Sequence, residues 1–335
     1  MAHQSKKRPF SSTVAPNTPK IPEHIVNELK PVVDIQRESL PESPLENLKK
    51  FQYAHRFLLS ALDQESQALP KWLWQQTPPA ELSNQEHKLW KMICFSLTSF
   101  VDNCTETTLG TTSAAMTHMG KDYERTWWVR RIVPVFQTFA NQTGLLAFDW
   151  CECEVRHHAL ADVDPEYCQT GTPWFADGLG YDWTGMERLV MEGSSGQHKE
   201  KLPKTIDDSV KQVHNMLNML KGIANTHLNS SFQTFSQTRV YGIQTIRATI
   251  ALSEMQMNDQ GKFVHRQALT ATIPTRHEER NKWLGVFNMV AYLLIALETQ
   301  VDNLAILDDE QEGKINVETE ETVRVKLCPV NPVMQ

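Results

Sequence analysis

The chain has 335 residues and a net charge of −7 at pH 7, and 40% of its residues are hydrophobic. This length is enough for one large domain or for two of ordinary size, and 14 glycines and 17 prolines are too few for a collagen-like or wholly low-complexity protein. The acidic balance, with a pI of about 6.0, argues against a protein that coats nucleic acid, since such domains usually have a pI above about 9.

The cysteines and the apolar runs indicate the compartment. The six cysteines are few and unevenly spaced in a chain too long to need disulfide staples. The first residues carry basic charges with no apolar run after them, so they do not resemble a secretory signal. The longest apolar stretch, from Trp283 to Leu297, is shorter than the roughly 20 residues of a membrane-spanning helix. We therefore expect free thiols, no membrane span, and a location in the nucleus, the cytoplasm or both.

Residues 1–42 are expected to form a disordered Pro/Ser-rich arm. Prolines remove helix donors, and the arm has too little apolar surface to offset the entropy of ordering. Within it, Lys6-Lys7-Arg8-Pro9 has the composition of a short nuclear-import signal, although a solvated basic tip explains it as well.

Residues 43–139 predict the first helical part of a domain that spans 43–307. Ser43-Pro44-Leu45-Glu46 combines a serine cap, a proline at the first helical position and a glutamate at the third. Apolar residues then recur every three or four positions in three segments, as on one face of a helix, and Pro134 should kink the third segment. These periodic residues are Leu48, Phe51, Ala54, Leu58, Leu62, Leu89, Trp90, Ile93, Leu97, Phe100, Trp127, Trp128, Ile132, Val135, Phe136 and Phe139.

Residues 140–204 change character. They are rich in Trp, Cys, Gly and Asp and follow no helical period. We predict compact irregular structure here, either as a packed insert or as an exposed surface excursion.

The most regular apolar pattern lies in residues 205–307. Two runs of seam positions predict an antiparallel helical hairpin, and residues from about 278 to 307 predict a buried helix. The seam in 206–257 either packs inside its own domain or pairs with another chain as a homo- or hetero-oligomer, with Arg239 and Ser253 helping to set the register. The seam residues are Ile206, Val210, Val213, Leu217, Leu220, Ala224, His227, Phe232, Phe235, Arg239, Ile243, Ile246, Ile250, Ser253 and Met257.

An acidic tail, residues 308–335, is expected to follow. The elements together predict a mostly all-α fold: an irregular helical bundle with a Trp/Gly-rich loop insert and disordered termini.

Trp127, Trp128, Arg130 and Arg131 are the candidate partner-binding residues. Aromatic side chains next to arginines can stack on a partner and bind its carboxylates or phosphates, and Trp and Arg are enriched among interface anchors. The alternative interpretation buries both tryptophans in the core and leaves the arginines on the wet face of the helix.

Cys151, Cys153, His157, His158 and Cys168 are the candidate metal ligands. Thiolate and imidazole are the ligands of tetrahedral zinc. The spacing of the first two cysteines is tighter than in common zinc sites and no second pair follows, so buried thiols beside exposed histidines are the alternative interpretation.

The carboxylate run Asp308-Asp309-Glu310-Gln311-Glu312 resembles the motif that binds Mg²⁺-diphosphate in isoprenoid synthases, which are all-α and of similar length. Its place near the end of the chain departs from that family, in which the motif lies in the first half of the catalytic domain. No phosphate loop, nucleophile elbow or kinase signature accompanies it.

The length, the Pro/Ser-rich head, and the Trp-rich middle with Val133-Pro134-Val135-Phe136 resemble the regulators encoded at fungal mating-type loci that lack a DNA-binding box. This resemblance implies a non-enzymatic protein needed in sexual development. We therefore expect a regulatory or scaffolding protein that acts through protein contacts, without catalytic residues or a cofactor, and that meets nucleic acid at most indirectly or weakly. A metal-dependent enzyme or zinc protein that uses the Cys/His cluster is the alternative, and an isoprenoid-synthase-like enzyme is a further one.

Overall fold

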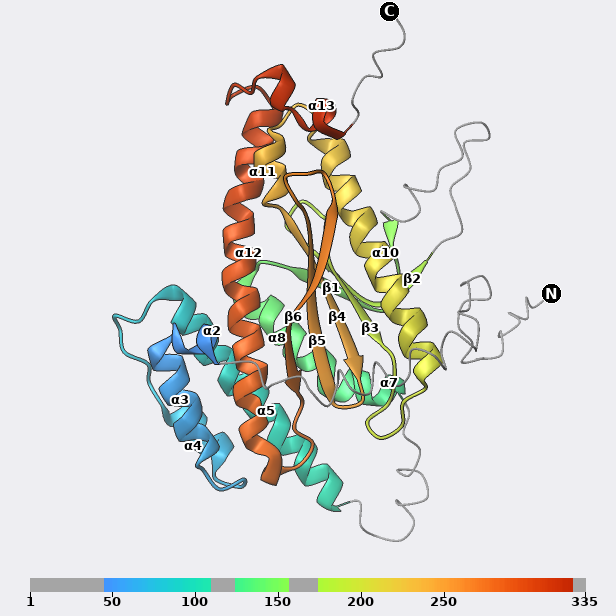
Figure 1. Ribbon diagram of the computed structural model, residues 1–335. Coiled ribbons are helices and arrows are strands. Elements are labelled where there is room, and N and C mark those ends of the chain that lie inside the picture. Colours follow the sequence, from blue (N-terminus) through green and yellow to red (C-terminus); the bar gives the residue numbers. More distant parts are fainter. Residues whose placement is uncertain (1–44, 110–123, 157–173, 328–335) are drawn as a thin grey trace, which may run out of the picture.

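A six-stranded mixed β-sheet lies at the centre of the computed structural model, which describes residues 45–109, 124–156 and 174–327 (Figure 1). The strands are β1 (Ala147–Glu154), β2 (Phe175–Tyr181), β3 (Glu187–Gly193), β4 (Arg239–Ile246), β5 (Thr249–Met257) and β6 (Phe263–Thr272). Their order in the sheet follows the chain, and neighbours are antiparallel except β3 and β4, which are parallel. The prediction of a mostly all-α bundle is therefore wrong.

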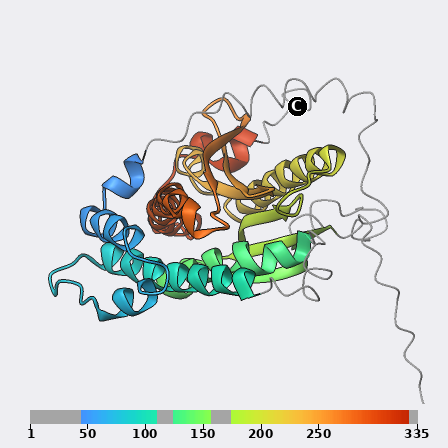
Figure 2. The same cartoon turned by 90° about the horizontal axis from the view of Figure 1, so that it is seen from below.

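Helices cover both faces of this sheet. The helix α10 (Leu202–Thr226) crosses from β3 to β4, as a parallel strand pair requires, and lies on one face. Figure 2 shows α5 (Asn84–Leu109) and α8 (Val133–Thr143) on the opposite side, where α12 (Trp283–Gln311) also packs. The shorter elements are α2 (Glu46–Lys49), α3 (Gln52–Leu62), α4 (Leu69–Gln75), α7 (Glu124–Trp127), the π-helical turn η1 (Trp128–Ile132), α11 (Phe232–Ser236), the 3₁₀ turns η2 (His277–Lys282) and η3 (Thr319–Glu321), and α13 (Val323–Leu327).

Each face of the sheet has its own apolar core. On the side of α12, the buried helical residues pack against Leu189, Ile243 and Leu252 of the strands. On the side of α10, Met216 and Leu220 are among the residues that pack against the strands. Burial of apolar side chains on both faces is the main stabilising contribution to such a layered fold.

The predicted second helix of the hairpin is a pair of strands. Residues 239–257 form β4 and β5, joined by a tight turn in which Arg247 has a φ of 55°. The segment is rich in Val, Ile, Thr and Tyr, whose branched or aromatic side chains favour strands. Tyr241 points to the core on the α12 side and Val240 to the core on the α10 side. Because both faces of these strands are buried, apolar residues occur at odd as well as even positions. Some of them are therefore three or four residues apart by chance, and this spacing imitates that of a helix.

Residues 140–204, which were predicted to be irregular, contain the first three strands of the sheet. The strand β3 is buried at every residue, so it lacks the alternation that reveals a strand in a sequence. The strand β1 is bulged between Trp150 and Cys153, where Cys151 and Glu152 have φ values of 67° and 58°. Residues 157–173 lie outside the described part of the chain.

The periodic apolar residues of 43–139 are confirmed as core, since every one is at most 9% exposed. Pro134 interrupts the third segment as expected: the π-helical turn η1 precedes it, and the proline lies in the first turn of α8, where its missing N–H group is not needed. The arm 1–42, with its basic tip, lies outside the described residues.

The helix α12 confirms the predicted buried helix. Together with η2, it is the one helix among the described residues that is long and apolar enough to cross a membrane, and 56% of its most apolar window is buried inside the fold.

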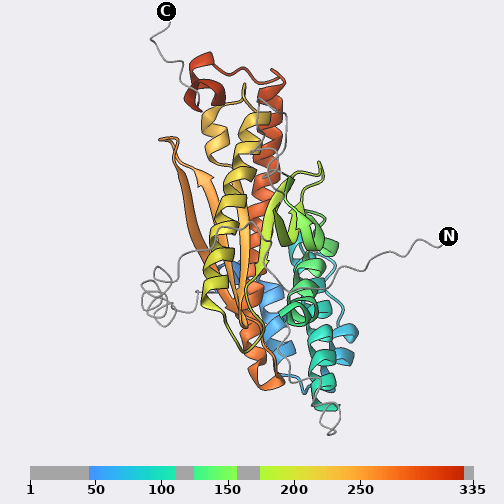
Figure 3. The same cartoon turned by 90° about the vertical axis from the view of Figure 1, so that its right-hand side faces the viewer.

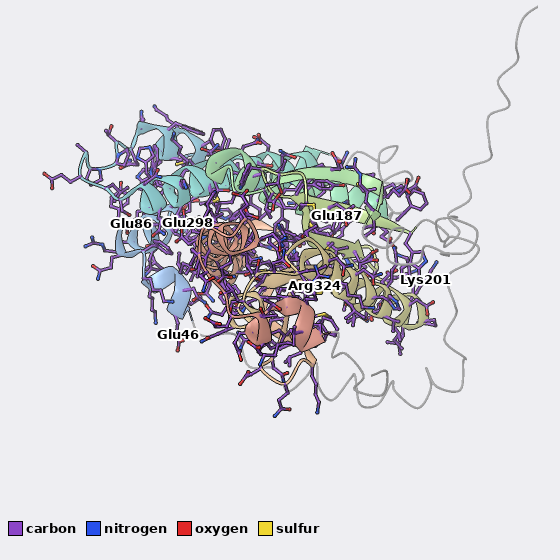
Figure 4. All side chains as sticks on the ribbon, turned by 90° about the horizontal axis from the view of Figure 1, so that it is seen from above. Glu46, Glu86, Glu187, Lys201, Glu298 and Arg324 are labelled. Carbon is purple, nitrogen blue, oxygen red and sulfur yellow. The ribbon has the colours of Figure 1, made fainter. Side chains whose placement is uncertain are left out.

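An ion pair links α12 to α5. Glu298 of α12 faces α5, where Lys88 Nζ lies 3.2 Å from Glu298 Oε1. Figure 4 shows Glu298 and Glu86 on the same side of the molecule.

Part of the predicted acidic tail belongs to the fold. The helix α12 continues to Gln311, Glu310 is 8% exposed, and Val323 of α13 is fully buried. Glu310 accepts hydrogen bonds from the backbone N–H of Ser231 (3.0 Å) and the hydroxyl of Thr234 (2.9 Å). Residues 328–335 lie outside the described part.

Replacing Glu279 with glutamine is expected to cost about 1 kcal/mol of folding free energy at neutral pH, after allowance for solvent screening at this partly exposed position. The carboxylate accepts hydrogen bonds from the Thr275 backbone N–H (3.0 Å) and hydroxyl (2.9 Å), and Lys282 Nζ lies 3.0 Å away. The Thr275 backbone hydrogen bond is the main cause that lowers the pKa of Glu279 to about 2. Because the pKa of Glu279 is lower in the folded than in the unfolded protein, the ionised side chain stabilises the fold at any pH above its unfolded-state pKa. This contribution is lost as the pH falls towards about 2.

Urea unfolding of wild type and E279Q checks this prediction at neutral and at acid pH. The difference between the two proteins should shrink as the pH falls below about 4. Glu278→Gln, at the exposed neighbouring carboxylate, is the control and should change little. A loss for E279Q that does not depend on pH would contradict the prediction.

Candidate functional site

A hollow of about 410 Å³ lies between α12, β4 and β5, with α2 at its rim. A second hollow of about 300 Å³ lies over β5 and β6, and Arg239 and Gln256 line both. We refer to the two adjoining hollows as the groove. The lining residues that bear on its chemistry are Asn47, Lys50, Arg239, Tyr241, Glu254, Gln256, Asp259, Arg266, Tyr292, Gln300 and Asn303.

A buried carboxylate organises the floor of the groove. Glu254 is 2% exposed. The Tyr292 hydroxyl donates a hydrogen bond to Glu254 Oε2, Arg266 Nε donates one to Oε1, and Arg239 Nη1 lies 3.8 Å from Oε2. These charge-assisted contacts satisfy a carboxylate that would be costly to bury alone.

Strand register brings these side chains together. Tyr241 of β4 pairs with Glu254 of β5, which pairs in turn with Arg266 of β6. In the next row, Arg239 pairs with Gln256, and Arg239 Nε donates a hydrogen bond of 2.7 Å to Gln256 Oε1. The groove was not predicted from the sequence, because the three-and-four spacing places Arg239 on a helix. A strand over 239–246 puts Arg239 and Tyr241 on one face, two residues apart, but the segment is buried on both faces and shows no alternation that would have revealed the strand.

The groove is suited to binding through hydrogen bonds and charge. Burial is the main cause that raises the pKa of Tyr292 to about 12, and its hydrogen bond to Glu254 adds to the shift. Burial also raises the pKa of Tyr241. Both phenols therefore stay protonated at neutral pH, and the Tyr292 hydroxyl donates its hydrogen bond to Glu254. The described lining contains no histidine or cysteine, the side chains that most often transfer protons near neutral pH.

The four candidate partner-binding residues follow one another at the end of α7 and in η1, but they do not share one surface. Trp127 and Trp128 are only 7% and 3% exposed. Arg130 is exposed, and Arg131 is partly buried, with its Nη2 3.4 Å from the carbonyl oxygen of Asn103. The tryptophans thus contribute to the core, and partner binding through the arginines stays a prediction.

Two of the five candidate zinc ligands are described, and His157, His158 and Cys168 lie outside the described residues. Cys151 is exposed and Cys153 is partly buried, both in β1. Burial raises the pKa of Cys153 to about 11, which disfavours the thiolate that binds zinc. In the described part of the chain, no three His, Cys, Asp or Glu side chains gather so as to hold a metal ion. Zinc binding by the complete cluster stays a prediction.

The carboxylates at 308–312 take part in the packing of the C-terminal segment. Asp308 Oδ1 lies 2.9 Å from His227 Nε2, and Glu310 binds Ser231 and Thr234. The mixed sheet also removes the all-α framework on which the likeness to isoprenoid synthases depends.

Comparison with known proteins identifies no family for this chain. No protein-family model matches it, and neither a curated protein nor a solved structure does.

Proposed function

We propose that the chain is a non-catalytic regulatory or scaffolding protein that acts through protein contacts, and that its groove binds an extended acidic segment of a partner. Charge carries this proposal. Lys50, Arg239 and Arg266 line the groove, against Asp259 and the buried Glu254, in a chain whose net charge is −7. A locally positive surface on an acidic protein attracts acidic partners and orients them.

Arg239 and Arg266 are already oriented so that they can bind a carboxylate of a partner. Arg266 keeps 60% of its side chain exposed and Arg239 keeps 38%, while Glu254 and Gln256 hold their guanidinium groups from below. An arginine whose orientation is already fixed loses little rotamer freedom when it binds, and this favours affinity.

The shape of the groove favours an extended chain over a compact small molecule. The two hollows adjoin across the face of β4 to β6. The β5–β6 hairpin projects from the body of the molecule (Figure 3). At its outer end, Val264 lines the second hollow and is 41% exposed. A peptide in the groove could place acidic side chains on the arginines and apolar ones on this end, as in other strand-lined peptide sites.

Reversing one charge at the rim tests the proposal. The probe is a labelled peptide of alternating glutamate and valine, followed by fluorescence anisotropy at low and high salt. Lys50→Glu is expected to weaken its binding about fivefold to tenfold, because reversing one exposed charge changes the interaction by about 1 kcal/mol or slightly more. Wild-type affinity should also fall with added salt.

Lys49→Glu is the matched control. Lys49 is the exposed last residue of α2, next to Lys50, but it does not line the groove, so K49E should bind the peptide as wild type does. Equal losses for the two variants, or equal binding of a lysine–valine peptide, would overturn the proposal. Full competition by citrate alone would show a site for small anions rather than for a peptide.

A further inference from the structure

The N-terminal arm joins the described fold at one end of the groove. Leu45 is the N-cap of the short helix α2, and Asn47 of this helix lines the larger hollow. The backbone N–H groups of Asn47 and Leu48 donate hydrogen bonds of 3.0 and 3.1 Å to Asn288 Oδ1 of α12, and Figure 1 shows α2 beside α12. These contacts fix the position of α2, so the residues that precede Leu45 along the chain start from the rim of the groove.

The acidic side chains of the arm gather in the part next to this point. Residues 31–44 carry three acidic side chains and one basic one, and residues 1–20 carry four basic ones and no acidic one. The three acidic residues are Asp34, Glu38 and Glu42. The part of the arm that has the shortest way to the groove therefore has the charge that opposes Arg239 and Arg266.

The spacing of two of these acids matches the spacing of the two arginines. Arg239 lies on β4, and Arg266 lies two strands away on β6, in the row of Glu254, which is the next row on the same face. With about 4.8 Å between strands and about 3.3 Å per residue along them, the two arginine Cα atoms are about 12 Å apart. The four residues from Asp34 to Glu38 span about 13 Å in an extended chain. One extended segment can therefore place a carboxylate on each arginine.

The residues around these acids favour an extended chain. Residues 31–44 contain three prolines, which disfavour a helix and favour extended backbone in the residues before them. Val33 and Ile35 flank Asp34, so an extended chain would turn Asp34 and Glu38 to one side and these apolar residues to the other. Such an alternating segment has the character that the groove requires of a ligand.

The length of the connection is sufficient. The seven residues from Glu38 to Leu45 reach up to about 23 Å when extended. Asn47 and Arg239 line one and the same hollow of about 410 Å³, so this reach brings Glu38 to Arg239. The chain then continues towards Arg266 in the second hollow, which places Asp34 there.

Other parts of the chain outside the described residues fit the groove less well. Residues 157–173 contain acidic side chains, but they connect β1 to β2, and these strands lie at the sheet edge opposite to β6. Residues 110–123 carry one acidic and one basic side chain, and residues 328–335 carry no acidic one. The charge and the point of attachment together select the arm.

We propose that residues 33–42 of the same chain occupy the groove, with Glu38 on Arg239 and Asp34 on Arg266, and that they compete there with the acidic segment of a partner. The competition rests on the proposed function, since both ligands use the two arginines, while Lys50 at the rim is left to the partner. A segment tethered by a short linker has an effective concentration on the order of 1 mM. A dissociation constant of about 0.1 mM is then enough to keep the groove filled about nine-tenths of the time.

Neutralising the two acids in the full-length chain tests the competition. Asp34→Asn together with Glu38→Gln is expected to bind the labelled glutamate–valine peptide about tenfold more tightly than wild type. The reason is that the apparent affinity is reduced by the fraction of molecules in which the groove is free. Glu23→Gln together with Glu28→Gln is the matched control, because it removes the same charge from the same arm outside the segment, and it should bind as wild type does.

Trypsin cleavage of the unaltered chain reports directly on the segment. Arg37 lies inside residues 33–42, and Lys20 lies in the arm outside them. Mass spectrometry should show slow cleavage after Arg37 relative to Lys20, and an excess of the glutamate–valine peptide should speed cleavage after Arg37 several-fold. A neutral glutamine–valine peptide should change neither rate. Arg266→Gln, checked by thermal melts to be folded, should speed cleavage after Arg37 without any peptide.

Three results would overturn the inference. They are equal peptide affinity for wild type and D34N/E38Q, an equal gain for E23Q/E28Q, and cleavage after Arg37 that neither the acidic peptide nor R266Q changes. The proposed function survives each of them, provided that wild type binds the peptide and K50E weakens that binding. If no variant binds the peptide while R266Q still speeds cleavage after Arg37, the segment docks in the groove and the proposed function alone fails.

Discussion

Replacing Lys211 with alanine is expected to destabilise the fold by about 3–5 kcal/mol, because it leaves the carboxylate of Glu192 buried without its cation. Glu192 is 1% exposed, and Lys211 Nζ lies within 3.0 Å of both its oxygens. Burial raises the pKa of Glu192, and Lys211 opposes that shift. In the alanine variant, the Glu192 carboxylate would either stay charged without a partner or take up a proton.

The loss in K211A should depend on pH in a definite direction. Without Lys211, the pKa of Glu192 in the folded state rises further above its unfolded value, so the folded state holds a proton that the unfolded state has released. Stability then falls as the pH rises through this range and recovers as the pH is lowered. Urea unfolding followed by circular dichroism should show a larger deficit at about pH 8 than at about pH 5.

Two further variants separate the ion pair from other effects. Glu192→Gln together with Lys211→Met removes both charges and should recover most of the stability, since a buried pair contributes little more than neutral groups of similar size. Lys221→Ala, at an exposed position of the same helix, should change stability by less than about 0.5 kcal/mol. A double variant as unstable as K211A would contradict the explanation.

Replacing Trp128 with alanine is expected to cost about 3–5 kcal/mol as well, the usual loss when a large aromatic side chain is removed from a core. Trp128 is 3% exposed, and its ring meets that of Trp150 edge-on at a centroid distance of 6.3 Å. A Cβ atom on Gly193 would lie 3.2 Å from Trp128 Cε3, so the indole packs directly on the backbone of β3. Thermal or urea unfolding measures the loss.

Arg130→Ala is the control for Trp128. Arg130 is exposed in the same π-helical turn, so its removal should leave stability within about 0.5 kcal/mol of wild type. A Trp128→Ala protein as stable as wild type would show that the indole is not a core residue. It would also restore the interpretation in which the tryptophans face a partner.

Local sequence was sufficient to predict the three longer helical segments of the first part and the long buried helix, but not the short helix α4, which contains Pro70. In those segments, apolar residues such as Leu58, Leu97 and Phe139 recur on one face, and a helix needs only neighbours along the chain to satisfy its backbone. Pro134 predicted the interruption of its helix in the same way, because the missing N–H group acts within one turn.

The strands could not be recognised in that way. A strand buried on both faces, such as β3, has no alternation, and its hydrogen-bond partners are distant in sequence. The groove depends on the same distant pairing, since the cross-strand row of Tyr241, Glu254 and Arg266 exists only in the register of β4, β5 and β6. None of these three residues belongs to a local motif.

The orientation of α10 shows most clearly where local and tertiary information differ. Spacing alone predicted a helix with an apolar seam at Ile206, Val210, Val213 and Leu217, and the helix is present. Which face of it is buried was decided by the ion pairs of Lys204 and Lys211 and by the close approach at Gly242. Those contacts come from β3, β4 and α7, and their strength depends on burial that exists only after the layers have packed.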